Sequence, residues 1–348
     1  MVSHAPGMPL AFLPSPSSNG FHVGPLFIHV YGLMYVVGIA LAIYITRRRW
    51  RAAGGDPALV ADVATWAVPA GIIGGRIYFD ITTPADIPPH WWGIFAVWSG
   101  GLGIWGGIAL GAAAGVWRVR RAGASASVFA NAIAPALLVA QAVGRIGNYF
   151  NQELFGKPSG LPWALEISAS HRPSGYTAFA TFQPTFLYEL IWDLALAAAL
   201  VWVGHHRNIR PPGLFALYVA GYSAFRIFEE SVRIDSSEHF LGLRLNFYVA
   251  SVGVLAGLIW FAWIQRRPER DGPEPVGAAG GAAIAASSGG ADIQVDENRA
   301  DESRAGDGEG DTDEGRAGAA SGDGRAGDSA QAGSGSGGSG VSSNAADK

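Results

Sequence analysis

Residues 27–51 read FIHVYGLMYVVGIALAIYITRRRWR, a long apolar run followed at once by four arginines. An α-helix needs about 20 such residues to cross roughly 30 Å of hydrocarbon, and arginine gathers on the cytoplasmic side of a membrane. Six further stretches have the same apolar character, with some polar interruptions. Together the predicted spans are 27–46, 60–80, 94–117, 127–146, 184–204, 212–230 and 246–264. The sequence therefore predicts an all-α polytopic membrane protein with seven transmembrane helices.

Arginine clusters orient the predicted helices. They follow the first, third, fifth and seventh spans, and so lie in every second connection. The members are Arg47, Arg48, Arg49 and Arg51, then Arg118, Arg120 and Arg121, then Arg207 and Arg210, and finally Arg266 and Arg267. The positive-inside rule assigns these connections to the cytoplasm, which places the N-terminus outside and the C-terminus inside. Because the N-terminus lacks the basic region and cleavage site of a signal peptide, we expect the first span to be retained.

Charge divides the chain into two parts. Residues 271–348 contain fifteen acidic and five basic residues, whereas the part before them carries a net charge of +6. The acidic part is rich in Gly, Ala and Ser and cannot bury enough apolar surface to fold. We therefore predict a seven-helix membrane domain over residues 1–267, with a small extracytoplasmic cap at about 149–183. Residues 268–348 are predicted to form a disordered cytoplasmic tail.

The chain contains no cysteine. Disulfides, thiolate metal sites and a nucleophilic cysteine of the protein's own are therefore excluded. His205 and His206 lie in a predicted cytoplasmic connection without the further ligands that a metal site needs. The sequence has no stripe of alternating basic and aromatic residues that would indicate nucleic-acid binding. Any thiol chemistry must use a thiol that a substrate supplies, and we expect neither a metal nor an organic cofactor.

Charged residues inside the predicted spans are the informative feature, because an arginine there costs about 2.5–3.5 kcal/mol on insertion scales. The intramembrane arginines are Arg76, Arg145 and Arg226. Arg226, Glu230 and Arg233 are spaced to share one face of a helix. A set of arginines that outnumbers its acidic neighbours suits the phosphate of a lipid headgroup. The alternative is internal ion pairing, of Arg226 with Glu230 and of Arg145 with Glu153, which would only hold helices together.

Glycines crowd the beginning of the predicted third span. They are Gly100, Gly101, Gly103, Gly106 and Gly107. The pattern lacks the preceding strand and the lysine of a phosphate-binding loop. We interpret these glycines as sites of close helix packing.

Residues 144–156, GRIGNYFNQELFG, resemble the signature of the prolipoprotein diacylglyceryl transferase family. Three further stretches agree in order and spacing: YGLMY at 31–35, PTFLYE at 184–189 and GYSAFR at 221–226. The resemblance runs from about residue 20 to 267 and includes the seven spans. It implies an enzyme of the bacterial cytoplasmic (inner) membrane.

The resemblance also implies a reaction. Phosphatidylglycerol would give its diacylglyceryl group to the thiol of the lipobox cysteine in a preprolipoprotein signal peptide, leaving glycerol phosphate. This is the first step of bacterial lipoprotein maturation. Catalytic roles are carried over to Tyr31, Arg145, Glu153, Arg226 and Glu230. Substrate-binding roles are carried over to Asn148, Asn151, Gly156 and Arg233, and the intramembrane set adds Arg76.

A mechanism can be sketched for these residues. A thiol of pKa about 8.5 is mostly protonated at neutral pH, and nearby arginines favour the thiolate. We expect Arg145 and Arg226 to bind the phosphate and to neutralise the charge that develops on it. Glu153 or Glu230 would orient an arginine or accept the thiol proton. Tyr31 would donate to the phosphate or position the lipid.

Two positions depart from the family pattern, since Trp105 and Gln183 stand where the family commonly has histidine. Either another group accepts the proton, or histidine is not the essential base. Two other classes of protein remain open. A lipid or small-anion transporter also places arginines in the membrane, but no internal repeat is evident. A structural scaffold of the membrane would tolerate replacement of these arginines.

Overall fold

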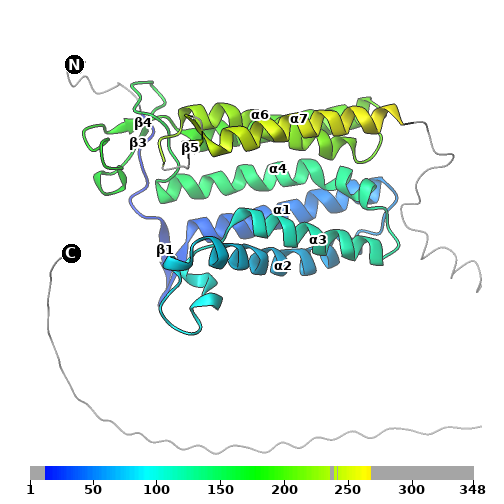
Figure 1. Ribbon diagram of the computed structural model, residues 1–348, viewed down its shortest axis with the longest axis horizontal. Coiled ribbons are helices and arrows are strands. Elements are labelled where there is room, and N and C mark those ends of the chain that lie inside the picture. Colours follow the sequence, from blue (N-terminus) through cyan, green and yellow to red (C-terminus); the bar gives the residue numbers. More distant parts are fainter. Residues whose placement is uncertain (1–11, 236–238, 241, 268–348) are drawn as a thin grey trace, which may run out of the picture. The chain divides into compact units, whose positions relative to one another are not determined.

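The computed structural model describes residues 12–235, 239–240 and 242–267 (Figure 1). This part of the chain forms seven α-helices and three short antiparallel sheets. The helices are α1 Val30–Ala52, α2 Ala58–Thr82, α3 Ile104–Arg121, α4 Ala126–Asn151, α5 Thr185–His206, α6 Gly213–Val232 and α7 Leu245–Arg266. The strands are β1 Gly20–Val23, β2 Leu26–His29, β3 Leu165–Glu166, β4 Thr181–Phe182, β5 His239–Phe240 and β6 Leu243–Arg244. The predicted tail, 268–348, lies outside the described residues.

Five of the described helices are long and apolar enough to cross a membrane: α1, α2, α4, α5 and α7. The other two carry charges that shorten their apolar length. α3 ends in Arg118, Arg120 and Arg121, and α6 contains Arg226, Glu229 and Glu230 near its C-terminus. The protein is therefore a mostly helical, multi-pass membrane protein.

The third helix begins later than the sequence predicts. The expected span was 94–117, but short 3₁₀ helices occupy Gly93–Phe95 and Val97–Ser99, and α3 starts only at Ile104. Gly100 and Gly101 lie between the second 3₁₀ helix and α3, and both have positive φ, of 86° and 78°. A right-handed helix cannot pass through two such residues, so this part of the predicted span is wrong.

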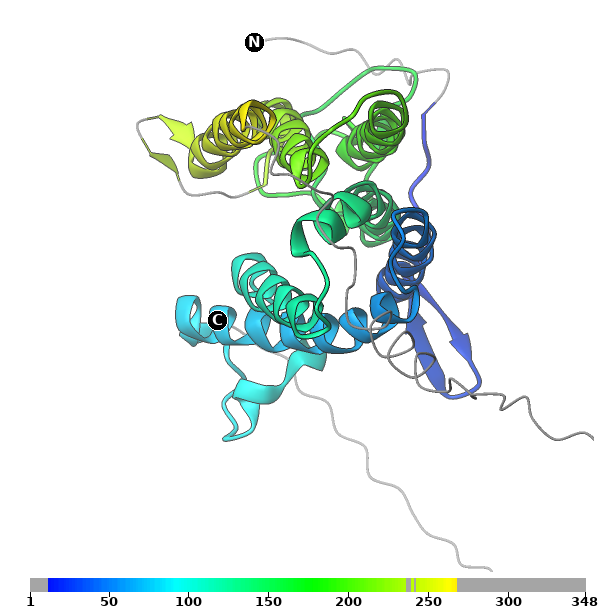
Figure 2. The same ribbon diagram turned by 90° about the vertical axis from the view of Figure 1, so that its right-hand side faces the viewer.

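α4 lies at the centre of the bundle, in contact with α1, α3, α5 and α6, as the end-on view of Figure 2 shows. α2 packs mainly against α3, and α7 packs against α6. One end of α4 can therefore present side chains both to α1 and to the pair α5–α6.

Glycines bring α2 and α3 close together. A Cβ added at Gly74 would lie 2.3 Å from the carbonyl oxygen of Gly106, and one at Gly106 would lie 2.1 Å from the carbonyl oxygen of Gly74. Gly107 faces Gly71 in the same way. The interpretation of the helical glycines as sites of close packing is confirmed for this interface.

A small folded unit follows α4, close to the predicted cap at 149–183. Its core contains Phe155, Leu165, Ile167 and Phe182. β3 pairs with β4, and Leu13 from the N-terminal segment pairs with Leu165. The unit is therefore built from residues after α4 together with the N-terminal segment around Leu13, which precedes β1.

Candidate active site

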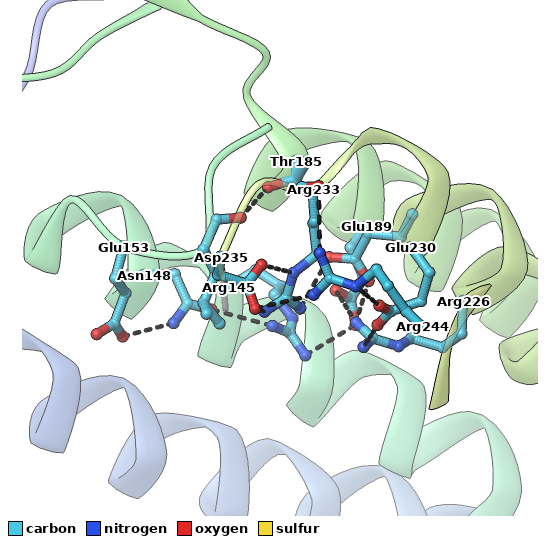
Figure 3. Close-up of polar contacts among 12 residues, drawn as sticks. Arg145, Asn148, Glu153, Thr185, Glu189, Arg226, Glu230, Arg233, Asp235 and Arg244 are labelled. Atoms are coloured by element: carbon cyan, nitrogen blue, oxygen red, sulfur yellow. Dashed lines mark hydrogen bonds and ion pairs between the residues drawn. The ribbon is translucent and has the colours of Figure 1, made fainter. Parts of the chain in front are cut away.

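Apart from Arg76, the predicted site residues come together at one end of the bundle, the end that bears the strands in Figure 1. Successive helices run in opposite directions, so the start of α1, the end of α4, the start of α5 and the end of α6 meet there. Tyr31, Arg145, Glu189 and Arg226 occupy these four positions. The polar contacts among the residues of α4, α5 and α6 are drawn in Figure 3.

Arg145 joins α4 to α5. Its guanidinium lies 2.8 Å from Glu189 Oε1 and donates a 3.1 Å hydrogen bond to Asn148 Oδ1. Glu189 is fully buried and also accepts a 3.2 Å hydrogen bond from the Tyr222 hydroxyl of α6. Three helices are thus connected through one carboxylate.

Arg226 lies among three carboxylates. It pairs with Glu229 and Glu230 on its own helix, and its Nη1 is 3.9 Å from Glu189 Oε2. The pair of Arg226 with Glu230, which the alternative of internal ion pairing predicts, is present. Arg233 does not continue that face, because α6 ends at Val232.

Arg233 and Arg244 surround Asp235 after the end of α6. Arg233 Nε lies 2.6 Å from Asp235 Oδ1, and Arg244 Nη2 lies 3.1 Å from Asp235 Oδ2. Burial raises the pKa of Asp235, but the hydrogen bonds and charges of the two arginines outweigh it and hold the pKa below its ordinary value. Asp235 is therefore ionised at neutral pH.

The charges of the cluster are balanced rather than positive. We define the arginine–carboxylate cluster as the eight residues joined by these ion pairs: Arg145, Glu189, Arg226, Glu229, Glu230, Arg233, Asp235 and Arg244. Four guanidinium groups meet four carboxylates. The expectation that arginines outnumber acidic neighbours is therefore wrong, because unpaired charges are costly away from water. An incoming phosphate must compete with a carboxylate for its arginine.

Glu153 is held by amides rather than by Arg145. Asn148 Nδ2 donates to Glu153 Oε1 at 2.7 Å, and Asn151 Nδ2 donates to the same oxygen at 3.3 Å. The alternative pairing of Arg145 with Glu153 is therefore replaced by a chain in which Asn148 lies between them. Neutral amides leave the charge of Glu153 uncompensated by any ion pair among the described residues.

The backbone around Glu153 is in an uncommon conformation. Gln152 and Leu154 both have positive φ, of 52° and 59°, which non-glycine residues rarely adopt. The Gln152 side chain accepts a 2.8 Å hydrogen bond from the Ser168 amide, and the Leu154 carbonyl accepts one from the Thr185 hydroxyl. These contacts turn the chain sharply at the end of α4 and place Glu153 beside Asn148.

Tyr31 and Gly156 contribute through close packing. The Tyr31 ring lies against Gly147, where an added Cβ would be 2.2 Å from Cδ2, and the Tyr31 hydroxyl is 3.1 Å from that of Tyr35. Gly156 bridges to Arg233, and its amide donates to the Gln183 carbonyl at 2.9 Å. Gly156 thus supports the position of Arg233 rather than offering a side chain to a ligand.

Arg76 lies apart from the cluster. Its guanidinium donates to the carbonyls of Gly93, Ile94 and Gly100 at 2.6, 3.0 and 2.8 Å, and pairs with Asp80 at 3.1 Å. These contacts fold the connection between α2 and α3 onto the end of α2. All three nitrogens of the guanidinium donate to backbone oxygens, so few of its N–H groups can bind a lipid headgroup.

Four members of the cluster were not among the predicted site residues: Glu189, Glu229, Asp235 and Arg244. Glu189 stands inside the quoted stretch 184–189, and Glu229 precedes a predicted residue, so both could have been found from sequence. Asp235 and Arg244 lie outside any helical pattern, and only the tertiary structure places them. Trp105 is the second residue of α3 and is half exposed.

These features define a multi-pass membrane protein with a buried polar site where α4, α5 and α6 meet. A sequence profile of the prolipoprotein diacylglyceryl transferase family matches residues 19–263. The chain belongs to that family.

Relatives from several bacteria carry the same name, phosphatidylglycerol–prolipoprotein diacylglyceryl transferase. The protein from Frankia alni is 46% identical over 265 residues, which is 75% of this chain and 69% of the relative. The protein from Cutibacterium acnes is 46% identical over 271 residues, covering 76% and 91%. A second form from Streptomyces coelicolor is 43% identical over 306 residues, covering 86% and 92%.

Proposed function

We propose that this protein transfers the diacylglyceryl group of phosphatidylglycerol to the lipobox cysteine of preprolipoproteins. The observation that carries the proposal is the convergence of Arg145 and Arg226, from two helices, on the buried carboxylate Glu189. Two guanidinium groups at one end of a membrane bundle suit a phosphodiester. Family membership favours this transferase over the transporter and the scaffold.

The reaction balances without a cofactor. The cysteine sulfur forms a bond to a glycerol carbon, the bond from that carbon to the phosphate oxygen breaks, and its electron pair stays on the phosphate. The thiol proton passes to a base and glycerol phosphate leaves. Arg145 and Arg226 stabilise the charge on the departing phosphate.

Glu153 is the proposed base. Its two hydrogen-bond donors are neutral amides, whereas Glu230 contacts Arg226 and Arg244. Both oxygens of Glu230 face arginines, whereas Glu153 has no ion pair among the described residues, and we therefore assign the thiol proton to Glu153. This assignment requires no histidine at the positions of Trp105 and Gln183.

The test is an in vitro transfer assay. Purified protein in detergent meets phosphatidylglycerol and a lipobox peptide, and mass spectrometry reads the mass of the peptide. We expect a diacylglyceryl increase on the cysteine that is lost in a Cys→Ser peptide and with Arg145→Ala. Arg172→Ala is the matched control, because among the described residues Arg172 bonds to the Ile167 and Thr177 carbonyls of the folded unit after α4 and to no member of the cluster. Full turnover by Arg145→Ala would refute the site.

The proposal includes the orientation of the chain in the cytoplasmic membrane. All seven helices would span it, with the cluster and the folded unit after α4 on the outer side. The arginine clusters support this orientation, because they lie at the helix ends opposite the site.

Single-cysteine labelling tests the orientation without background, since the chain has no cysteine. Ser170→Cys lies on the exposed surface of the folded unit, and Ala53→Cys lies on the exposed connection after α1. In intact cells an impermeant maleimide should label the first and not the second. The reverse pattern would contradict the proposed orientation.

A further inference from the structure

Arg244, just before α7, makes one contact with α6 and two with the residues that follow it. Its Nε lies 2.7 Å from Glu230 Oε2, its Nη2 lies 3.1 Å from Asp235 Oδ2, and its Nη1 donates to the Arg233 carbonyl at 3.2 Å. The side chain is only 11% exposed. A guanidinium that is mostly shielded from solvent and has three partners at the site is held in one position, unlike a solvated surface charge.

Glu230 is shared between two arginines. Its Oε1 pairs with Arg226, and its Oε2 pairs with Arg244. We propose that Arg244 is a positioning residue that retains Glu230 when Arg226 turns from this carboxylate to the phosphate of the donor lipid. The inference rests on the proposed function, because it assumes that Arg226 binds phosphatidylglycerol.

Charge balance around Glu230 requires a second cation. The Glu230 side chain is 1% exposed, so it cannot be solvated by water when Arg226 leaves. Without a second cation, phosphate would have to displace Arg226 from an otherwise unpaired buried carboxylate, and this is strongly unfavourable. With Arg244 in place, Glu230 remains paired and Arg226 is free to exchange partners.

The geometry of the shared contact permits this exchange. The 2.7 Å contact between Arg244 Nε and Glu230 Oε2 is not aligned as a hydrogen bond, so neither atom has spent its hydrogen-bonding capacity there. Glu230 can therefore turn toward Arg244 and form a stronger contact once Arg226 has gone. Asp235 and the Arg233 carbonyl keep Arg244 in place during the exchange.

The experiment measures phosphatidylglycerol binding at equilibrium and the KM and kcat of transfer for Arg244→Gln. We expect the Kd and KM for phosphatidylglycerol to rise roughly tenfold, with a smaller change in kcat, as loss of a bond between charged groups implies. Arg244→Lys, which keeps the charge, should recover part of the affinity and provides a folded comparison. Arg172→Gln is the matched control and should leave the Kd unchanged.

A double-mutant cycle separates this role from a merely structural one. In a Glu230→Gln background there is no carboxylate to retain, so Arg244→Gln should change the Kd for phosphatidylglycerol less than twofold. An equal loss of affinity in both backgrounds, or a loss of kcat at constant KM, would overturn the inference. Wild-type protein that neither binds phosphatidylglycerol nor transfers would instead defeat the proposed function. Normal wild-type transfer with an unaffected Arg244→Gln variant would defeat this inference alone.

Discussion

Glu189 is the carboxylate on which the arginines of α4 and α6 converge. It is fully buried, 2.8 Å from Arg145 and 3.9 Å from Arg226. Removing one partner of a buried ion pair commonly costs about 3–5 kcal/mol, because the other charge is left without compensation. Arg145 therefore depends on this residue of α5 for its ion pair, whereas Arg226 also pairs with Glu229 and Glu230.

Glu189→Gln keeps the size of the side chain and removes its charge. We expect a lower melting temperature in detergent and a transfer rate reduced roughly a hundredfold, since a loss of about 3 kcal/mol corresponds to that factor. Thermal unfolding and the transfer assay measure the two effects. Glu166→Gln, in β3, is the matched control. Wild-type stability together with wild-type turnover would show that Glu189 does not organise the arginines.

Gly156 is tightly enclosed where the folded unit meets α6. An added Cβ would lie 2.7 Å from Val232 Cγ1 and 3.0 Å from Gln183 Cβ. Gly156→Ala should displace Val232 and its neighbour Arg233, destabilise the protein by about 1–3 kcal/mol and reduce transfer. Gly160→Ala is the control, because no atom of the described residues lies within 4 Å of its added Cβ. Equal melting temperatures and rates for the two variants would contradict this explanation.

At the scale of elements, the α2–α3 interface depends on glycine. The backbones of Gly74 and Gly106 approach so closely that neither position has space for a methyl group. Such contacts stabilise helix association in a membrane. Moving an apolar side chain from lipid to a helix interface gains little free energy there, so close packing of the backbones matters more. The same helices carry the connection that Arg76 folds back by its bonds to backbone carbonyls.

Gly106→Ala tests this interface. The alanine Cβ would meet the Gly74 carbonyl oxygen at 2.1 Å, so the helices must separate. We expect a lower melting temperature and a lower yield of folded protein. Gly32→Ala in α1 is the control, since the part of the chain that the structure describes has no atom within 4 Å of its added Cβ. Replacing glycine by alanine in an exposed helix stabilises the helix by about 0.5–1 kcal/mol. The melting temperature should therefore rise in Gly32→Ala and fall in Gly106→Ala.

At the scale of the whole molecule, function is expected to lie within residues 12–267. The family match ends at residue 263, and the last residue of the cluster is Arg244. The strongly acidic segment that follows supplies none of the groups in the proposed reaction.

A variant that ends at residue 267 should therefore transfer diacylglyceryl at the wild-type rate. A variant that ends at residue 232 lacks α7, which packs against α6, and should be inactive. Both are measured in the same transfer assay at equal amounts of folded protein. A large loss of rate in the longer variant would assign a direct role to the acidic segment.

The sequence predicted the helices well where composition is decisive. Long apolar runs located all seven, and the error in the third arose at Gly100 and Gly101, which have positive φ and whose carbonyl oxygens accept hydrogen bonds from Arg76 of α2. Half of the arginine–carboxylate cluster was predicted as well, because arginine and glutamate in apolar surroundings are conspicuous: Arg145, Arg226, Glu230 and Arg233. The excess of positive charge was predicted wrongly, because the carboxylates Glu189, Glu229 and Asp235 were not counted.

The sequence by itself determined that this is a multi-pass helical membrane protein of the prolipoprotein diacylglyceryl transferase family, because apolar length and motif order are properties of the linear chain. Only the tertiary structure decided which charges meet. It joined Arg145 to Glu189 rather than to Glu153, and placed Arg244 beside Glu230. The physical reason is that a buried charge takes the best-placed opposite charge in space, whatever its distance along the chain.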